Sequence, residues 1–289
     1  MLSLLETPLK GLFARSGGAA YGVFDHGAHV WAWTPDGGAP VLWMSAQSRF
    51  ADGAPVRGGA PVCFPWFGPG RSGAMEPAHG FARLTEWRRG EVSDRTESDG
   101  HLVVDYHLDS AMVAPQPAFP HDFAATLRVD FARDYMQVDL EVKNTGRESF
   151  SFEEALHTYL AVGDARRIRI EGLDGAAYLD KAPGAPSPRA TQRGAIEISG
   201  ETDRVYESEA TATVIDPVLG RRLIIAKGGS AQTVIWNPWI DKARAMADFG
   251  DDEWTGMVCV EAANALDKAV HVAPGGHHRL WQRVRVEAM

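Results

Sequence analysis

The chain has 289 residues, of which 45% are hydrophobic and 23% are charged. These fractions are typical of a globular protein and exclude a disordered or fibrous chain. The 29 lysines and arginines against 38 aspartates and glutamates give a formal net charge of −9. Nucleic acids and anionic membranes attract basic surfaces, so neither is expected as a partner.

The two cysteines, Cys63 and Cys259, cannot build a disulfide framework and show no zinc-binding spacing. A reducing compartment therefore fits best. The apolar start, residues 1–5, is too short for a signal peptide, and no run of about 18 apolar residues suggests a membrane span. We expect a soluble cytoplasmic protein that is a monomer or a weak oligomer.

Most of the chain alternates apolar and polar residues with a period of two and is rich in β-branched and aromatic residues. A long strand pair is predicted from 123–131 and 136–143, and the second of these strands has one wet face. A second hairpin is predicted from 30–33 and 41–44, joined by a Pro/Gly turn at 35–38. Further strands are predicted at 102–108, 167–170, 195–198, 212–215, 222–226, 233–236, 257–261 and 280–286.

Helical periodicity is scarce, and only 241–247 could form one or two turns. Many short strands with little helix predict an all-β fold, a large antiparallel β-sandwich, rather than a Rossmann or TIM architecture. The Pro-rich stretch 182–188 is the best linker candidate, but the composition does not shift after it, which favours a surface loop. Residues 1–289 are therefore expected to form a single domain.

Two loop segments carry residues that a core does not need. Residues 57–68 read Arg-Gly-Gly-Ala-Pro-Val-Cys-Phe-Pro-Trp-Phe-Gly, and the glycines would let the backbone beside Arg57 turn tightly and approach a ligand. Residues 77–83 place His79 and Arg83 on one short loop, where a guanidinium could hold an anion. Taken alone, such side chains more often have an ordinary structural role.

A histidine and a glutamate stand in otherwise apolar strands. Residues 152–160 predict a strand on which His157 shares one face with Ala155 and Tyr159. An imidazole exchanges protons near neutral pH, although a buried histidine bonded to a backbone carbonyl is the commoner case. Glu261 follows an apolar run, which carboxylates rarely enter unless they are paired or functional.

The sequence gives little support to a metal site. His26 and His29 are spaced by two residues and His277 is adjacent to His278, but no carboxylate or cysteine completes a known ligand spacing. No Gly-x-Ser-x-Gly motif occurs either. We expect neither a metal nor another cofactor.

Together these segments resemble the hexose-6-phosphate mutarotases, a branch of the aldose 1-epimerase superfamily. The resemblance rests on six segments in family order: 57–68, His-Gly-Phe-Ala-Arg at 79–83, Glu-Ala-Leu-His-Thr-Tyr at 154–159, Tyr-Leu-Asp-Lys at 178–181, Trp-Asn-Pro-Trp at 236–239 and Val-Cys-Val-Glu-Ala-Ala-Asn at 258–264. It implies a galactose mutarotase-like β-supersandwich. The implied activity is interconversion of the α and β anomers of a phosphorylated hexose, such as glucose 6-phosphate, without a cofactor.

The resemblance also implies roles for individual residues. His157 is similar to the family's general acid and Glu261 to its general base. Arg57 and Arg83 match arginines that hold the 6-phosphate, and Asp180 matches a residue that contacts sugar hydroxyls. The expected substrate-binding residues are thus Arg57, His79, Arg83 and Asp180. Ala78 stands where family members often carry a glutamine, so one substrate hydrogen bond would be missing.

The implied chemistry agrees with the residue types present. Mutarotation needs one proton delivered to the ring oxygen and one removed from the anomeric hydroxyl, so that the ring opens to an aldehyde and closes again. It requires no nucleophile, hydride carrier or metal. A phosphate approaching a chain of net charge −9 needs a local positive anchor, which the two arginines could supply.

Three alternatives stay open. A glycoside hydrolase could use Glu153 or Glu154 together with Glu261 as its two carboxylates. An aldose 1-epimerase of unphosphorylated sugar would not need Arg57 and Arg83. A non-catalytic carbohydrate-binding β-sandwich would need no proton-transfer pair.

Overall fold

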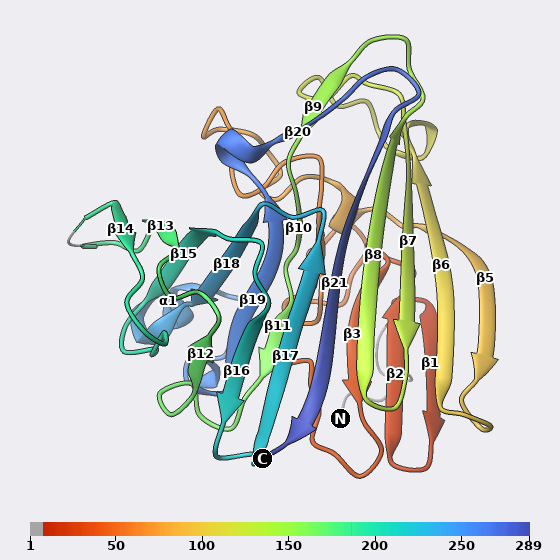
Figure 1. Ribbon diagram of the computed structural model, residues 1–289. Coiled ribbons are helices and arrows are strands. Elements are labelled where there is room, and N and C mark those ends of the chain that lie inside the picture. The colour runs from red at the N-terminus through yellow and green to blue at the C-terminus, as the bar shows by residue number, and fades with distance from the viewer. Residues whose placement is uncertain (1–7, 186) are drawn as a thin grey trace.

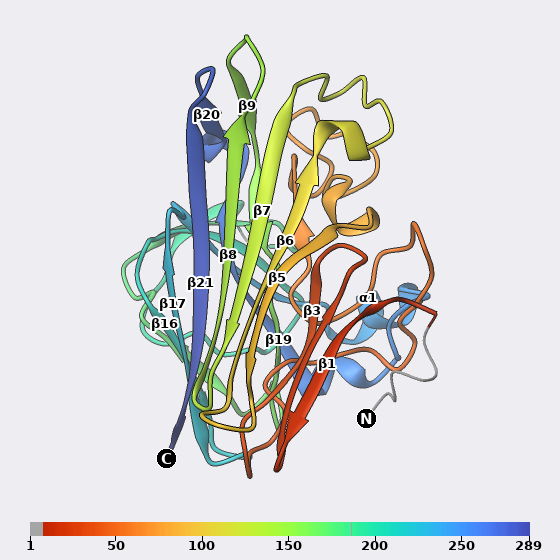
Figure 2. The ribbon, with the colours of Figure 1, turned by 90° about the vertical axis from the view of Figure 1, so that its right-hand side faces the viewer.

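Two eight-stranded sheets dominate the computed structural model, which describes residues 8–185 and 187–289 (Figures 1 and 2). Side chains of both sheets, such as Leu140 of one and Val260 of the other, belong to one buried apolar cluster. Every strand pair is antiparallel, which confirms the predicted all-β sandwich. No helix in this part of the chain is long and apolar enough to cross a membrane.

Sheet I contains the longest strands, which cross the front of Figure 1. Its strands in spatial order are β12 (Arg169–Glu171), β16 (Ala212–Asp216), β17 (Arg221–Gly228), β21 (His277–Ala288), β8 (Tyr135–Asn144), β7 (Phe123–Phe131), β6 (His101–Asp109) and β5 (Arg88–Arg95). The predicted pair 123–131 and 136–143 is confirmed as β7 and β8. The apolar residues of β8 face the core because each alternates with a polar neighbour.

Sheet II lies behind sheet I in Figure 1. Its strands in spatial order are β14 (Arg189–Thr191), β13 (Ala177–Asp180), β15 (Thr202–Glu207), β18 (Gln232–Asn237), β19 (Met257–Asn264), β10 (Glu154–Leu156) and β4 (Val62–Cys63), and β11 (Tyr159–Ala161) also pairs with β19. All residues of β18 and β19 are buried, because one face packs on sheet I and side chains such as Phe67, Ala243 and Phe249 cover the other.

Smaller elements complete the molecule. They are a three-stranded sheet of β1 (Gly11–Ser16), β2 (Ala19–Phe24) and β3 (His29–Thr34), a two-stranded sheet of β9 (Phe150–Phe152) and β20 (Val270–Val272), the helix α1 (Trp239–Ala245), and 3-10 turns at Ala82–Leu84, Ser110–Met112, Glu253–Gly256 and Leu266–Lys268. The helix predicted at 241–247 thus exists but begins two residues earlier. The described residues of 182–188 connect β13 to β14 within sheet II, as a loop would. Residues 1–7, which include the apolar start, lie outside the described residues.

The predicted hairpin of 30–33 with 41–44 is wrong. The chain reverses as expected through a turn in which the Gly38 N–H donates to the Pro35 carbonyl, but β3 pairs with β2 instead. Val41 donates its backbone N–H to the Trp33 carbonyl at 2.9 Å, but no strand pairing follows, and Leu42 and Met44 make only isolated bridges. Residues 41–44 turn toward sheet II because Trp43 donates its N–H to the Tyr159 carbonyl and stacks on the Tyr159 ring.

The single strand predicted at 152–160 is also wrong. The structure breaks it into β9, β10 and β11, with the second break at His157 and Thr158. At this break the Thr158 N–H donates to the Leu156 carbonyl, two residues back, instead of to a neighbouring strand. The face predicted for His157 nevertheless holds, because β10 and β11 keep one register against β19.

An ion pair at the edge of the core, between the half-buried His278 and the buried Glu154, links sheet II to β21. His278 Nε2 lies 3.0 Å from Glu154 Oε1 and 2.8 Å from the Gly229 carbonyl oxygen. The hydrogen bond to Glu154 raises the pKa of His278 against the opposing effect of burial. Protonated His278 therefore favours the folded state.

We expect this pair to contribute stability that is fully present below about pH 6.5, the unperturbed histidine pKa, and is lost as pH rises through the higher folded pKa. His278→Gln should reduce the fall of unfolding free energy with rising pH, measured by urea titration from pH 5.5 to 8.5. His277→Gln alters the exposed neighbour and is the matched control. Parallel pH curves for wild type and His278→Gln would contradict the expectation.

Candidate active site

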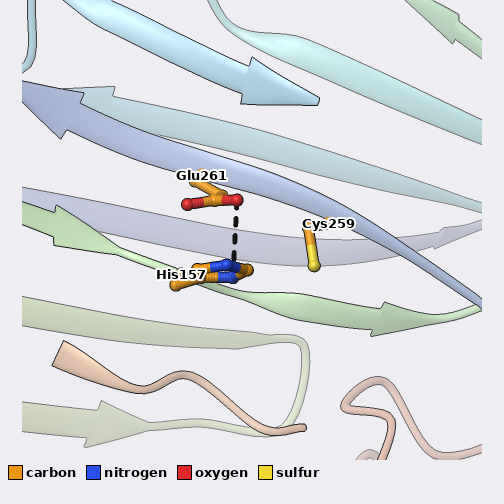
Figure 3. A group of neighbouring side chains, drawn as sticks. All are labelled: His157, Cys259 and Glu261. Atoms are coloured by element: carbon orange, nitrogen blue, oxygen red, sulfur yellow. Dashed lines mark ion pairs between the residues drawn. The ribbon is translucent and has the colours of Figure 1, made fainter. Parts of the chain in front are cut away.

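His157 and Glu261 face each other across two neighbouring strands. Ala155 pairs with Ala263 and Tyr159 pairs with Cys259, so the same register places His157 opposite Glu261. Directly opposite residues of an antiparallel pair point to the same face. His157 Nδ1 lies 3.4 Å from Glu261 Oε1, without hydrogen-bond geometry (Figure 3). Both side chains are buried, which removes them from competing water.

The surroundings disfavour the charged form of both groups. Burial, then the charges of Arg57, Arg83 and Lys181, lower the pKa of His157 to about 3. Burial and then Asp203 raise the pKa of Glu261 well above its usual range, and Lys181 opposes this only in part. These shifts favour a neutral imidazole and a protonated carboxyl group.

The pair lies between two apolar clusters on the face of sheet II that points away from sheet I. Cluster A consists of Cys63, Phe67, Ala155, Val205, Val234, Ala263 and Ala265, and cluster B of Tyr159, Trp236, Ala243, Phe249, Trp254, Met257 and Cys259. The His157 ring stacks on the Tyr159 ring, with centroids 4.8 Å apart and planes 9° apart. The Trp236 ring meets the same imidazole edge-on. This packing fixes the plane of the imidazole.

His79 is brought to the same site by two glycine-dependent loops. Its ring centroid is 5.4 Å from that of His157. The Gly68 N–H donates to His79 Nδ1, so the neutral ring carries its proton on Nε2. Gly80 has a φ of +74°, and a Cβ there would lie 2.1 Å from the Phe64 carbonyl oxygen. Glycine is needed at position 80 because the two loops touch.

Arg57 is held by two partners. Its Nε and Nη2 donate to Asp248 Oδ2 at 3.2 and 3.1 Å, and its Nη1 donates to the Tyr159 hydroxyl at 2.9 Å. The guanidinium is thus oriented in advance, with its charge partly balanced by Asp248. Gly59, two residues after Arg57, packs closely against another part of the chain. It approaches β3, where a Cβ would lie 2.3 Å from the Val30 carbonyl oxygen.

Arg83 differs from Arg57 in having no carboxylate partner among the described residues. Its Nη2 donates to the Ala78 carbonyl at 2.8 Å, and its buried Nε has no partner. Burial lowers the pKa of Arg83, and the nearby Arg57 contributes to this. The charges of Arg57 and Arg83 thus act on each other, and both act on His157.

Asp180 is the one predicted site residue that the structure does not bring to the pair. In β13 it pairs with Arg204, in a row that continues through Ile235 to Val260 on the face toward sheet I. Arg204 Nε donates to Asp180 Oδ2 at 3.0 Å.

The next residue, Lys181, lies on the site face instead. Its Nζ is 3.6 Å from Asp203 Oδ1 and 5.6 Å from the Phe67 ring centroid. Asp203 occupies the row that continues through Trp236 and Cys259, beside Glu261. The Lys181–Asp203 pair therefore lies on the site face, where the sequence predicted Asp180 alone.

Neither of the glutamates considered for a hydrolase is available. Glu153 accepts backbone N–H groups of Phe67 and Leu266 with its two carboxylate oxygens. Glu154 faces sheet I and is bound to His278. Neither Glu153 nor Glu154 can therefore act with Glu261 as the second carboxylate of a glycoside hydrolase.

Cys259 completes a group of three possible metal ligands with His157 and Glu261 (Figure 3), whose ligand atoms lie within 4.8 Å of one another. Metal ligands must be deprotonated. Burial raises the pKa of both the Cys259 thiol and the Glu261 carboxyl group. Arg57 and Lys181 add positive charge to the site. This environment does not suit a divalent cation.

Four residues of the site have roles that the sequence did not predict. They are Tyr159 as the support of His157, Asp248 as the partner of Arg57, and the Lys181–Asp203 pair. Strand alternation places Tyr159 on the face of His157, but it does not predict that the two rings stack. Asp248 is 191 residues from Arg57 and has no local signal.

Comparisons with known proteins show the family of the chain. The family model described as aldose 1-epimerase matches residues 14–285. A protein of Cenchrus ciliaris and one of Salmonella typhimurium, each named "Putative glucose-6-phosphate 1-epimerase", are both 33% identical. The matches cover 89% of this chain and 78% of the first, and 90% and 84% for the second. A solved Salmonella typhimurium structure titled a "putative mutarotase" superimposes with a TM-score of 0.84 at 27% identity, covering 100% of this chain and 96% of that one. The chain belongs to the aldose 1-epimerase family.

Proposed function

We propose that this protein interconverts the α and β anomers of a hexose 6-phosphate by general acid/base catalysis. The observation that carries the proposal is the His157–Glu261 pair, 3.4 Å apart and buried, beside Arg57 and Arg83. The pair can move protons, and the arginines can hold a phosphate. The names of the two 33% identical relatives support the same substrate class.

The pair holds the right number of protons for the reaction. A neutral imidazole beside a protonated carboxyl group carries as many protons as an imidazolium beside a carboxylate, so the two forms differ only by an internal transfer. In the second form His157 donates to the ring oxygen while Glu261 removes the proton of the anomeric hydroxyl. The sugar ring opens to an aldehyde, which rotates about one carbon–carbon bond. The ring then closes with the two proton movements reversed.

The phosphate itself would favour the active form. Arg57, Arg83 and Lys181 lower the pKa of His157 in the unliganded protein. A bound dianion offsets these positive charges, so it should raise that pKa and favour the imidazolium. His79, with its proton on Nε2, would donate a hydrogen bond to a sugar oxygen, and the Lys181–Asp203 pair would contact hydroxyl groups.

We further propose that residues 1–289 act as a single cytoplasmic domain on this small-molecule substrate, without a nucleic-acid partner. Both cysteines are free buried thiols, which suits a reducing compartment.

The test is anomer exchange measured by saturation-transfer NMR on glucose 6-phosphate, with glucose and galactose alongside. We expect exchange of the phosphorylated sugar well above its uncatalysed rate. Preference for a free sugar would instead favour an aldose 1-epimerase of unphosphorylated substrates. No acceleration of any sugar, together with measurable binding, would favour a non-catalytic carbohydrate-binding protein.

Exchange should survive exhaustive dialysis against EDTA, because the charges around His157, Cys259 and Glu261 disfavour a cation and the reaction needs no Lewis acid. The measurement compares rates before and after dialysis. A loss that one specific divalent metal restores would contradict this expectation.

A further inference from the structure

Two polar side chains are buried directly behind the His157–Glu261 pair, where the core needs none. Thr158 is 1% exposed and Gln282 is 2% exposed. Thr158 follows His157, so its side chain points to the opposite face of sheet II, toward sheet I. Gln282 lies on β21 of sheet I. Burying polar groups is unfavourable unless they form hydrogen bonds, so their partners indicate what they do.

The backbone at His157 departs from strand geometry, and this leaves the Val260 carbonyl without the Thr158 N–H that would bond to it in a regular ladder. Opposite residues of an antiparallel ladder exchange two hydrogen bonds at every second pair. Val260 donates its N–H to the Thr158 carbonyl at 3.2 Å. The return bond is missing, because the Thr158 N–H donates to the Leu156 carbonyl at 3.0 Å and closes a tight turn centred on His157.

Gln282 supplies the missing donor. Its Nε2 donates to the Val260 carbonyl at 3.0 Å, and its Oε1 accepts the Thr158 hydroxyl proton at 2.5 Å. A carbonyl can only accept, so the amide nitrogen must face Val260. One side chain from sheet I thus bonds to both strands that carry the pair, one residue from His157 and one from Glu261.

We propose that Gln282 and Thr158 are positioning residues that hold the turn at His157 and so keep His157 opposite Glu261. The proposal rests on the proposed function, since it assigns these residues to the geometry of the same acid/base pair. Neither residue touches the substrate. Their contribution should appear in the proton-transfer step, because a displacement of about 1 Å can slow a reaction by about 100-fold.

The first experiment compares Gln282→Leu and Thr158→Val with Val284→Ala in the full chain. Val284 is a fully buried apolar residue on the same strand and face as Gln282, so it controls for lost stability. We expect Gln282→Leu and Thr158→Val to lower kcat for glucose 6-phosphate by about 10- to 100-fold with KM changed less than about threefold. Thr158→Ser, which keeps the hydroxyl, should restore most of the rate.

Val284→Ala should leave kcat near the wild-type value at a similar loss of Tm. An equal loss of kcat in the control, or a normal kcat in folded Gln282→Leu, would overturn the proposal.

A second readout does not depend on activity. In protein with 15N-labelled histidine, Gln282→Leu should shift or broaden the imidazole signals of His157, whereas Val284→Ala should leave them unchanged. If wild type accelerates no anomer exchange, the proposed function fails while this comparison still decides the positioning role. Unchanged His157 signals in Gln282→Leu would overturn that role whatever the activity.

Discussion

Replacing His157 by Asn or Glu261 by Gln is expected to slow anomer exchange by about two to four orders of magnitude. Each substitution keeps a hydrogen-bonding side chain of similar shape but removes the group that gives or takes a proton. The fold should survive, because the site disfavours the charged form of both groups and a neutral amide replaces each. Saturation-transfer NMR on glucose 6-phosphate, corrected for the uncatalysed rate, measures the effect.

The double variant separates a working pair from two independent groups. Residues that act as a unit give strongly non-additive losses, so His157→Asn/Glu261→Gln should be about as slow as the slower single variant. Thermal unfolding of all three proteins checks the fold. Near-normal exchange in a folded single variant would remove that residue from the mechanism.

The strands that the sequence predicted well are those whose environment imposes alternation. β7 and β8 pair along their whole length and bury one face, so their bounds agree with the prediction within two residues. β5 was missed because all of its residues are exposed and show no alternating pattern. Residues 41–44 were misassigned because Trp43 packs on Tyr159, more than 100 residues later, and no local pattern encodes that contact.

In the site too, local motifs could be predicted from the sequence but long-range contacts could not. His157, Glu261 and the two arginines came from the sequence through motifs, but His157 meets Glu261 only through the register of β10 and β11 against β19. Arg57 joins them through its contact with the Tyr159 hydroxyl. Asp180 illustrates the limit, since successive residues of a strand face opposite sides. The structure places Asp180 with Arg204 toward sheet I, and the next residue, Lys181, toward the pair.

The arginines should decide substrate choice. Arg83 has no carboxylate partner among the described residues, so its charge is free for a phosphate. A charge-assisted contact contributes about 1.5–3 kcal/mol, so Arg83→Ala should lower kcat/KM for glucose 6-phosphate by about one to two orders of magnitude. Turnover of free glucose, which lacks the phosphate, should change little. Arg83→Lys should recover only part, because an ammonium has no bidentate fork.

Arg57→Ala should cost more than Arg83→Ala on the phosphorylated sugar. It removes one positive charge and also leaves Asp248, its partner at 3.1 Å, as an unpaired negative charge near the phosphate. The double variant Arg57→Ala/Asp248→Asn removes that repulsion and should regain part of the loss. Steady-state kcat/KM for glucose 6-phosphate and for glucose in all four variants measures these effects. If both substrates lose activity in parallel, the arginines are structural and the phosphate site lies elsewhere. If only the phosphorylated sugar loses activity but Asp248→Asn regains nothing, the phosphate binds Arg57 on the side away from Asp248.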